Sequence, residues 1–134
     1  MLPEGLEASG PPPGAILIVE DNEVNALILR SMLRKRGYDP VVAADGIEGV
    51  ELSDRHRPRL ILMDLQMPRL DGFAAAAEIR RKAGGASPTI VAVTANTAGE
   101  IVDACEAAGF ACVLTKPIDF EDLIATVRRL LGAA

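Results

Sequence analysis

Five short runs of apolar residues recur along this chain, and they restrict its possible folds more than any other feature. The runs cover residues 15–19, 40–44, 60–63, 89–93 and 111–114. Short runs rich in Val, Ile and Leu, without alternating polar residues, are typical of strands buried on both faces. Segments with helical spacing of apolar residues follow each run, at residues 22–36, 46–56, 72–82, 99–108 and 120–131.

The regular alternation of strand and helix predicts an α/β fold. Strands joined by helical crossovers run parallel, with helices on both faces of the sheet. Residues 14–134 are predicted to form this single domain. In the helical segment 22–36, apolar residues at helical spacing include Val24, Leu27, Ile28 and Leu33. Residues 1–13 contain three consecutive prolines and few apolar side chains, which predicts a flexible leader or linker.

Composition excludes several classes of protein. Apolar residues make up 49% of the chain, which is enough for a core without disulfides or structural metal. The net charge of −5 argues against a nucleic-acid-binding surface, which would be basic. Cys105 and Cys112 are too few for a zinc site and suit a reducing compartment. No run is long enough to span a membrane and no signal peptide is evident, so we predict a cytoplasmic protein.

Polar residues directly follow four of the five apolar runs. These residues are Glu20 and Asp21, Asp64, Thr94 and Lys116. In open parallel sheets, ligands bind at the carboxyl ends of the strands. The sequence therefore predicts that three carboxylates, a hydroxyl and an amine meet at one edge of the sheet.

This group of side chains indicates phosphoryl chemistry. Neighbouring carboxylates repel each other unless one gains a proton or all share a cation, and oxygen ligands suit Mg²⁺. With a lysine and a hydroxyl to hold an anion, these carboxylates and a bound Mg²⁺ could support transfer of a phosphoryl group to an aspartate. No nucleotide-binding glycine motif is present, so the donor is expected to be another molecule. Taken singly, Asp21 or Asn22 could be the cap of the helix that follows, Thr94 could be another helix cap, and Lys116 could be a surface lysine.

Four separate stretches carry a resemblance to a known family. They are residues 16–22, residues 63–68 with Asp71 and Gly72, residues 93–95 and residues 115–118. In order and spacing they resemble response-regulator receiver domains of two-component signalling, especially the receivers of hybrid sensor histidine kinases. The resemblance runs from about residue 15 to the end of the chain. It implies a flavodoxin-like doubly wound sheet with strand order 2-1-3-4-5.

The resemblance also implies roles for the polar residues. Asp64 would accept the phosphoryl group. Mg²⁺ would be held by Glu20, Asp21, Asp64 and the backbone carbonyl of Gln66. The side chains of Gln66 and Asn96 flank the site, and we expect them to influence the hydrolysis of the acyl phosphate.

Further roles follow from the same resemblance. Lys116 would pair with Asp64 or the phosphoryl group, and its bond to Pro117 would be cis, as in the family. Thr94 would move toward the phosphoryl oxygen. The family places a Tyr or Phe three residues before the lysine, where this chain has Val113. We therefore expect weaker coupling between the site and an output partner on the face formed by residues 99–108, 111–114 and 120–131.

Three functions are open at this point. The first is a signalling switch phosphorylated by a histidine kinase or histidine phosphotransfer domain, which catalyses only its own phosphoryl transfer and dephosphorylation. The second is an intermediate or sink that passes the group to a histidine phosphotransfer domain, and Val113 favours it. The third is an aspartate-nucleophile phosphatase. It is disfavoured because such enzymes need a second acid at position 66, which is Gln.

Overall fold

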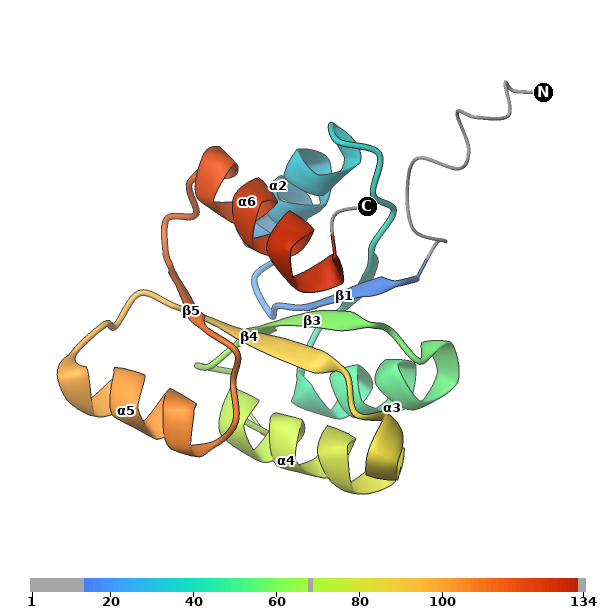
Figure 1. The fold of residues 1–134 in the computed structure, drawn as a ribbon, viewed down its shortest axis with the longest axis vertical. Helices are drawn as coiled ribbons and strands as arrows, with labels where there is room; N and C mark the ends of the chain where they lie inside the picture. The colour runs from blue at the N-terminus through green and yellow to red at the C-terminus, as the bar shows by residue number, and fades with distance from the viewer. Residues whose placement is uncertain (1–13, 68, 133–134) are drawn as a thin grey trace.

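A five-stranded parallel sheet forms the centre of the molecule in the computed structural model, which describes residues 14–67 and 69–132 (Figure 1). The strands are β1 (Ile16–Val19), β2 (Val41–Ala43), β3 (Leu60–Asp64), β4 (Thr89–Thr94) and β5 (Val113–Thr115). Their order in the sheet is β2-β1-β3-β4-β5, and every neighbouring pair is parallel. The predicted flavodoxin-like fold is therefore confirmed. The leader predicted at residues 1–13 lies outside the described residues.

Helices cover both faces of the sheet, as predicted. They are α2 (Glu23–Arg34), α3 (Gly46–His56), α4 (Gly72–Ala83), α5 (Gly99–Ala107) and α6 (Phe120–Leu131), with a short 3₁₀ turn at Gly84–Ala86. Figure 1 shows α2 and α6 on one face and α3, α4 and α5 on the other. Four of the five α-helices begin after an Asn or Asp whose side chain accepts a backbone N–H of the first turn; these residues are Asn22, Asp45, Asp71 and Asp119. Such caps satisfy N–H groups that have no partner within the helix.

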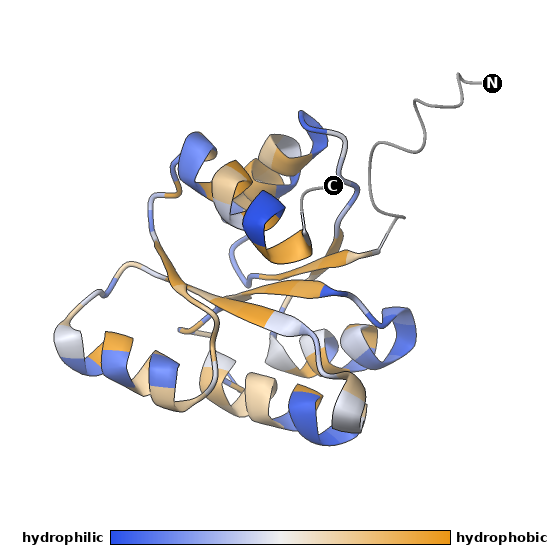
Figure 2. Ribbon diagram, viewed as in Figure 1, coloured by the Kyte–Doolittle hydropathy of each residue, from blue (hydrophilic) through white to orange (hydrophobic). Residues whose placement is uncertain are grey.

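The strand residues supply two aliphatic core layers, one on each side of the sheet. In β1, Leu17 and Val19 pack under α3 and α4, while Ile16 and Ile18 pack under α2 and α6. Figure 2 shows the strands as the most hydrophobic part of the ribbon. Both faces of each inner strand are buried, which explains the uninterrupted apolar runs in the sequence.

The apolar spacing of α2 is only partly explained by the core. Leu33 is fully buried, together with Ala26 and Leu29. Val24, Leu27 and Ile28, in contrast, are 64%, 60% and 46% exposed. These three side chains, called here the α2 apolar surface, leave an unusual amount of hydrocarbon in contact with water.

Two further features of the described chain bear on its chemistry. None of its helices is long and apolar enough to cross a lipid bilayer. Cys105 is buried and Cys112 half-buried, and both are free thiols. Burial raises the pKa of the Cys105 thiol, so this residue behaves as a small core side chain.

Candidate functional site

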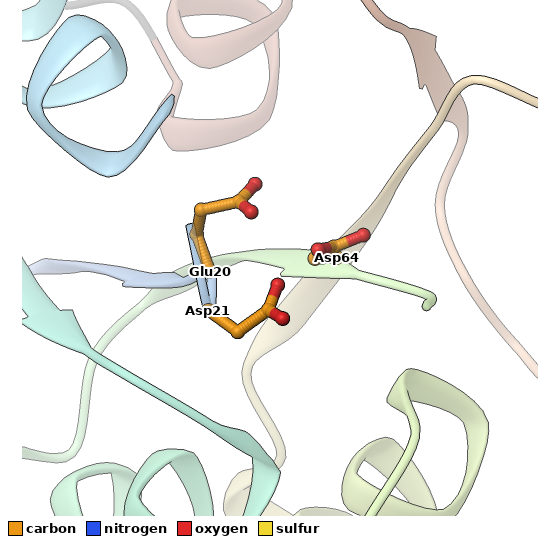
Figure 3. A group of neighbouring side chains, drawn as sticks. All are labelled: Glu20, Asp21 and Asp64. Atoms are coloured by element: carbon orange, nitrogen blue, oxygen red, sulfur yellow. The ribbon is translucent and has the colours of Figure 1, made fainter. Parts of the chain in front are cut away.

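Three carboxylates and one lysine meet where β1, β3 and β5 end. Glu20 and Asp21 directly follow β1, and Asp64 is the last residue of β3. Each offers one oxygen, and these oxygens all lie within 4.8 Å of one another (Figure 3). The Nζ atom of Lys116 lies 3.1 Å from Oε1 of Glu20 and 3.4 Å from Oδ2 of Asp64. The structure thus brings together four of the five predicted side chains.

Burial of two of these carboxylates makes the site electrostatically unusual. Glu20 is 2% exposed and Asp64 3%, whereas Asp21 faces solvent. Burial, reinforced by the negative charge of Glu20, raises the pKa of Asp64 to about 6. For Lys116, burial opposes the charged form, but close contact with Glu20 and the charges of Asp64 and Glu20 outweigh it and raise its pKa. The single ammonium only partly compensates the negative charge.

One oxygen of Glu20 is left without a well-aligned hydrogen bond. Oε2 accepts the backbone N–H of Asn22 at 3.2 Å. Oε1 is buried and has the Lys116 ammonium nearby, yet no donor is aligned with it. A buried oxygen in this state costs free energy unless another positive group approaches it. One oxygen of Asp64 does have a hydrogen bond, because Oδ1 accepts the backbone N–H of Gln66 at 3.2 Å.

Thr94 occupies the end of β4, the strand next to β3. Its side chain is buried, and Oγ1 accepts the backbone N–H of Asn96 at 3.0 Å. The hydroxyl proton is therefore available for a further acceptor. Val113 opens β5 and is half-buried opposite Ala92. The predicted cis bond between Lys116 and Pro117 is present.

Close backbone packing holds the loop between β3 and α4 against the site. A methyl group on Gly72 would lie only 2.5 Å from the carbonyl oxygen of Asp64. A methyl group on Gly46 would lie 2.2 Å from the carbonyl oxygen of Leu70. Only glycine permits these approaches, because every other residue carries a Cβ atom. Both glycines therefore fix where the loop that follows Asp64 can run.

An ion pair that we did not predict from the sequence adds to this anchoring. Arg69 has a left-handed backbone (φ 68°) and pairs with Oδ2 of Asp45. Oδ1 of Asp45 accepts the backbone N–H of Glu48 at 2.8 Å and caps α3. That hydrogen bond and the charge of Arg69 lower the pKa of Asp45. Residues 24 positions apart carry no sequence signal for such a pair, and only the folded chain reveals it.

The lone histidine is remote from the carboxylates. His56 ends α3, and its Nδ1 lies near Gly14, just before β1. This is the amino-terminal end of the strands, opposite the edge that holds Asp64. His56 is exposed at this position, and among the described residues nothing connects it to the carboxylates.

Comparison with known proteins assigns the family. The family model described as the response regulator receiver domain matches residues 16–128. The chain belongs to this family. Receiver domains are signalling domains of two-component systems and are not conventional enzymes.

Individual relatives agree with this assignment. The transcriptional regulatory protein PdtaR of Mycobacterium tuberculosis is 40% identical over 122 residues, which are 90% of this chain and 58% of PdtaR. The chain thus spans just over half the length of that relative. The receiver domain of the Pseudomonas aeruginosa sensor histidine kinase PA1611, solved with a magnesium ion in its active-site cleft, has a TM-score of 0.81 and 39% identity, covering 90% of this chain and 99% of that one.

A third relative was solved together with a partner. The receiver domain of Saccharomyces cerevisiae Ssk1, in complex with the histidine phosphotransfer protein Ypd1, superimposes with a TM-score of 0.81 and 33% identity. The match covers 89% of each chain. Similarity therefore extends to a transcriptional regulator, to the receiver of a sensor histidine kinase and to a receiver solved in a phosphotransfer complex.

Proposed function

We propose that this domain is a phosphorylation-dependent signalling switch that accepts a phosphoryl group on Asp64. The observation that carries the proposal is the burial of the Asp64 carboxylate between Glu20 and Lys116 at the ends of the strands. A carboxylate in this setting is held in a fixed position for attack, and the lysine can compensate charge that it gains.

The same residues fit a divalent cation. Glu20, Asp21 and Asp64 each offer an oxygen, and these oxygens lie within 4.8 Å of one another. Oε1 of Glu20, which has no aligned hydrogen bond, would gain a second positive partner there beside Lys116. We propose that these carboxylates and the backbone carbonyl of Gln66 hold Mg²⁺, the ion found in the PA1611 receiver. When bound, Mg²⁺ would neutralise charge on the carboxylates and on the phosphoryl oxygens.

The transfer itself uses the side chains of this chain. A carboxylate oxygen of Asp64 attacks phosphorus in line with the bond to the donor nitrogen. A P–O bond forms, the P–N bond breaks, and its electron pair returns to the imidazole, which takes up a proton. Lys116 is placed to hold a phosphoryl oxygen, and the free hydroxyl proton of Thr94 can be donated to another. These new bonds would favour a second arrangement of the domain.

The α2 apolar surface is a suitable docking site for the donor. Val24, Leu27 and Ile28 are exposed on the helix that begins just after the carboxylates. A groove of about 340 Å³ connects Ile28 with Lys116 and Glu20. We propose that a histidine kinase or histidine phosphotransfer domain covers this surface while its phosphohistidine reaches Asp64. The Ssk1 receiver was solved together with a partner of this class, the histidine phosphotransfer protein Ypd1.

A relay function is the second candidate, and Val113 favours it. An aliphatic side chain at the start of β5 has no ring that could turn between buried and exposed positions. In that case the domain would receive the phosphoryl group and return it to a histidine phosphotransfer domain. The chemistry at Asp64 is the same for both functions.

Gln66 and Asn96 are expected to set the lifetime of the phosphorylated state. Both are exposed and lie two residues beyond Asp64 and Thr94, with backbone N–H groups bonded to those side chains. Their amides could orient or exclude the attacking water. We expect Gln66→Ala together with Asn96→Ala to change the hydrolysis rate several-fold, measured as loss of phosphate from the intact protein. An unchanged rate would refute this role.

Phosphorylation by a small donor tests the proposal. The protein is incubated with acetyl phosphate and Mg²⁺, and the mass of the intact chain is followed. We expect one phosphoryl group per chain, lost on treatment with alkali, and absent when Mg²⁺ is chelated or in the Asp64→Asn variant. Equal labelling of that variant, or none of the wild-type protein with Mg²⁺ present, would contradict the proposal.

A further inference from the structure

A groove at the β2 edge of the sheet lies outside the candidate site and combines cationic with apolar side chains. It has a volume of about 500 Å³, which is within the range of small-molecule sites. Residues 40–42, at the start of the edge strand β2, supply its apolar part. Arg30 and Arg34 of α2 also line it, together with His56 of α3. Figure 1 shows α2 and α3 on opposite faces of the sheet, so side chains from both faces meet at this edge.

Arg30 is the lining residue that most clearly lacks a partner. Its side chain is half-buried, and its Nε atom is buried without a hydrogen-bond acceptor among the residues that the structure describes. No carboxylate within residues 14–67 and 69–132 forms an ion pair with it. A buried donor without an acceptor costs free energy, and this cost is removed when an acceptor approaches.

The helix dipole does not explain Arg30. Cations in the last turn of a helix are common because they interact favourably with its carboxyl end. Arg34 is in that position in α2, whereas Arg30 lies one turn earlier. The guanidinium of Arg30 is therefore placed beside the groove without a local reason within its own helix.

The charge around the groove is positive, although the whole chain carries a net charge of −5. Three cations, at residues 34–36, lie at the end of α2, and Arg55 lies in the last turn of α3. Asp39, the acid among the described lining residues, is paired with Arg34, with Oδ1 3.2 Å from Nη2. The charge of Arg30 remains uncompensated by this pair. An anion is therefore the ligand that the groove favours.

We propose that this groove binds a small phosphomonoester, with its phosphate oxygens on Arg30 and its apolar part against residues 40–42. A guanidinium presents several N–H donors in a planar fork, which matches two oxygens of a phosphate. An extended polyanion such as nucleic acid is disfavoured, because Asp39 interrupts the positive surface. The groove lies at the amino-terminal ends of the strands, away from Asp64. Binding there is therefore separate from the phosphoryl transfer proposed above.

Titration with phenyl phosphate tests the proposal. At about pH 7 its phosphate is mostly a dianion. It is added to ¹⁵N-labelled protein at constant ionic strength and without divalent cations. We expect saturable shifts of the backbone signals of Val41 and Val42 and of the Nε–H signal of Arg30, with a dissociation constant of about 1 mM or below. Inorganic phosphate should bind at least about threefold more weakly because it has no apolar group, and phenol should not saturate the site because it has no charge.

Arg30 and a matched cation outside the groove locate the site. Arg30→Gln should weaken binding of phenyl phosphate about tenfold, because the charge and the fork of donors are both lost. Arg30→Lys keeps the charge but not the planar fork, and its affinity should fall about threefold. Arg55→Gln removes the same charge from an exposed position of α3 that does not line the groove, so its affinity should change by less than about twofold.

Thermal unfolding shows whether each variant is folded, and Arg30→Lys provides the test if Arg30→Gln does not fold. Four results would each overturn the proposal. They are titration without saturation, equal loss of affinity in Arg30→Gln and Arg55→Gln, equal binding of inorganic phosphate, and shifts centred on Asp64. None of these measurements requires phosphorylation of Asp64, so the groove and the proposed function are tested independently.

Discussion

Asp64 is charged at a position where burial and the carboxylate of Glu20 both disfavour a negative charge. Its folded-state pKa of about 6 exceeds the ordinary value of 3.8. Between these values the folded protein binds more protons than the unfolded chain, so stability falls as the pH rises from about 4 to above 6. The site therefore destabilises the fold at neutral pH. In the proposed function, this cost keeps an ionised carboxylate ready for reaction.

Asp64→Asn is expected to stabilise the protein in the absence of divalent cations. At about pH 7 the gain should be on the order of 1–2 kcal/mol, because a neutral amide removes the cost of burying a charge and the repulsion from Glu20. Near pH 4 the gain should be much smaller, since wild-type Asp64 is then largely protonated. Urea unfolding at both pH values measures the difference.

Asp103→Asn serves as a control, because this acid is exposed on α5 and should change stability by less than about 0.5 kcal/mol. Excess Mg²⁺ should stabilise the wild type and narrow the gap to Asp64→Asn. If Asp64→Asn is less stable than the wild type at neutral pH without cations, burial and the charge of Glu20 do not destabilise the ionised carboxylate as argued here.

At the scale of elements, the loop between β3 and α4 determines the geometry around Asp64. Gly72 begins α4 directly beneath the carbonyl of Asp64, and Gly72 N–H is bonded to the carbonyl of Leu65 at 3.1 Å. Arg69 and Asp45 tie the outer part of this loop to the start of α3. The loop is thus anchored at both ends, which keeps Gln66 next to the carboxylate.

Gly72→Ala should destabilise the protein by about 1–3 kcal/mol, because its Cβ would meet backbone atoms that cannot move freely. We also expect slower phosphorylation, since the adjustment displaces Asp64. Gly99→Ala is the matched control: Gly99 also begins a helix, but nothing lies within 4 Å of its added methyl group. It should be neutral or stabilising by up to about 1 kcal/mol. Equal effects of the two substitutions in thermal unfolding would contradict the packing argument.

The elements themselves could be predicted from the sequence because their signals are local. The apolar runs and the helical spacing that follows them placed each strand and helix within about two residues, although β5 begins at Val113, not Ala111. The carboxylates could be placed together because parallel strands end at one edge. The Asp45–Arg69 pair could not be predicted, since it depends on how two loops approach.

Sequence spacing was a poor guide to burial in α2. Val24, Leu27 and Ile28 share the helical spacing of core residues, yet they face solvent. The helix is apolar over more than half of its circumference, so the pattern cannot tell which apolar side the sheet covers. The exposed side of α2 and its buried side are both aliphatic, so composition does not distinguish them.

At the scale of the whole molecule, two surfaces flank the sheet. The α2 apolar surface adjoins Lys116 and Glu20, whereas a second groove, lined by Val102, Phe110 and Val113, lies between α5 and β5. Of the two, only the α2 side includes residues of the candidate site, so we expect the donor to approach there.

The Ile28→Glu variant tests docking of the phosphoryl donor separately from phosphorylation of Asp64. We expect transfer from a phosphorylated histidine phosphotransfer protein to slow by about tenfold or more, because a charge is placed in a desolvated contact. Phosphorylation by acetyl phosphate should remain unchanged, since the small donor needs no docking surface. Ala77→Glu, exposed on α4 on the other face of the sheet, is the control. Equal slowing with both donors would mean that Ile28 acts on the site and not on docking.

The position of the phosphoryl group tests the central claim most directly. The protein is phosphorylated with acetyl phosphate and Mg²⁺, treated with borohydride to reduce the acyl phosphate, digested and sequenced by mass spectrometry. Residue 64 should be recovered as homoserine, with Glu20, Asp21 and His56 unmodified. Modification of any residue other than Asp64, or an unmodified residue 64 in protein known to be phosphorylated, would contradict the account.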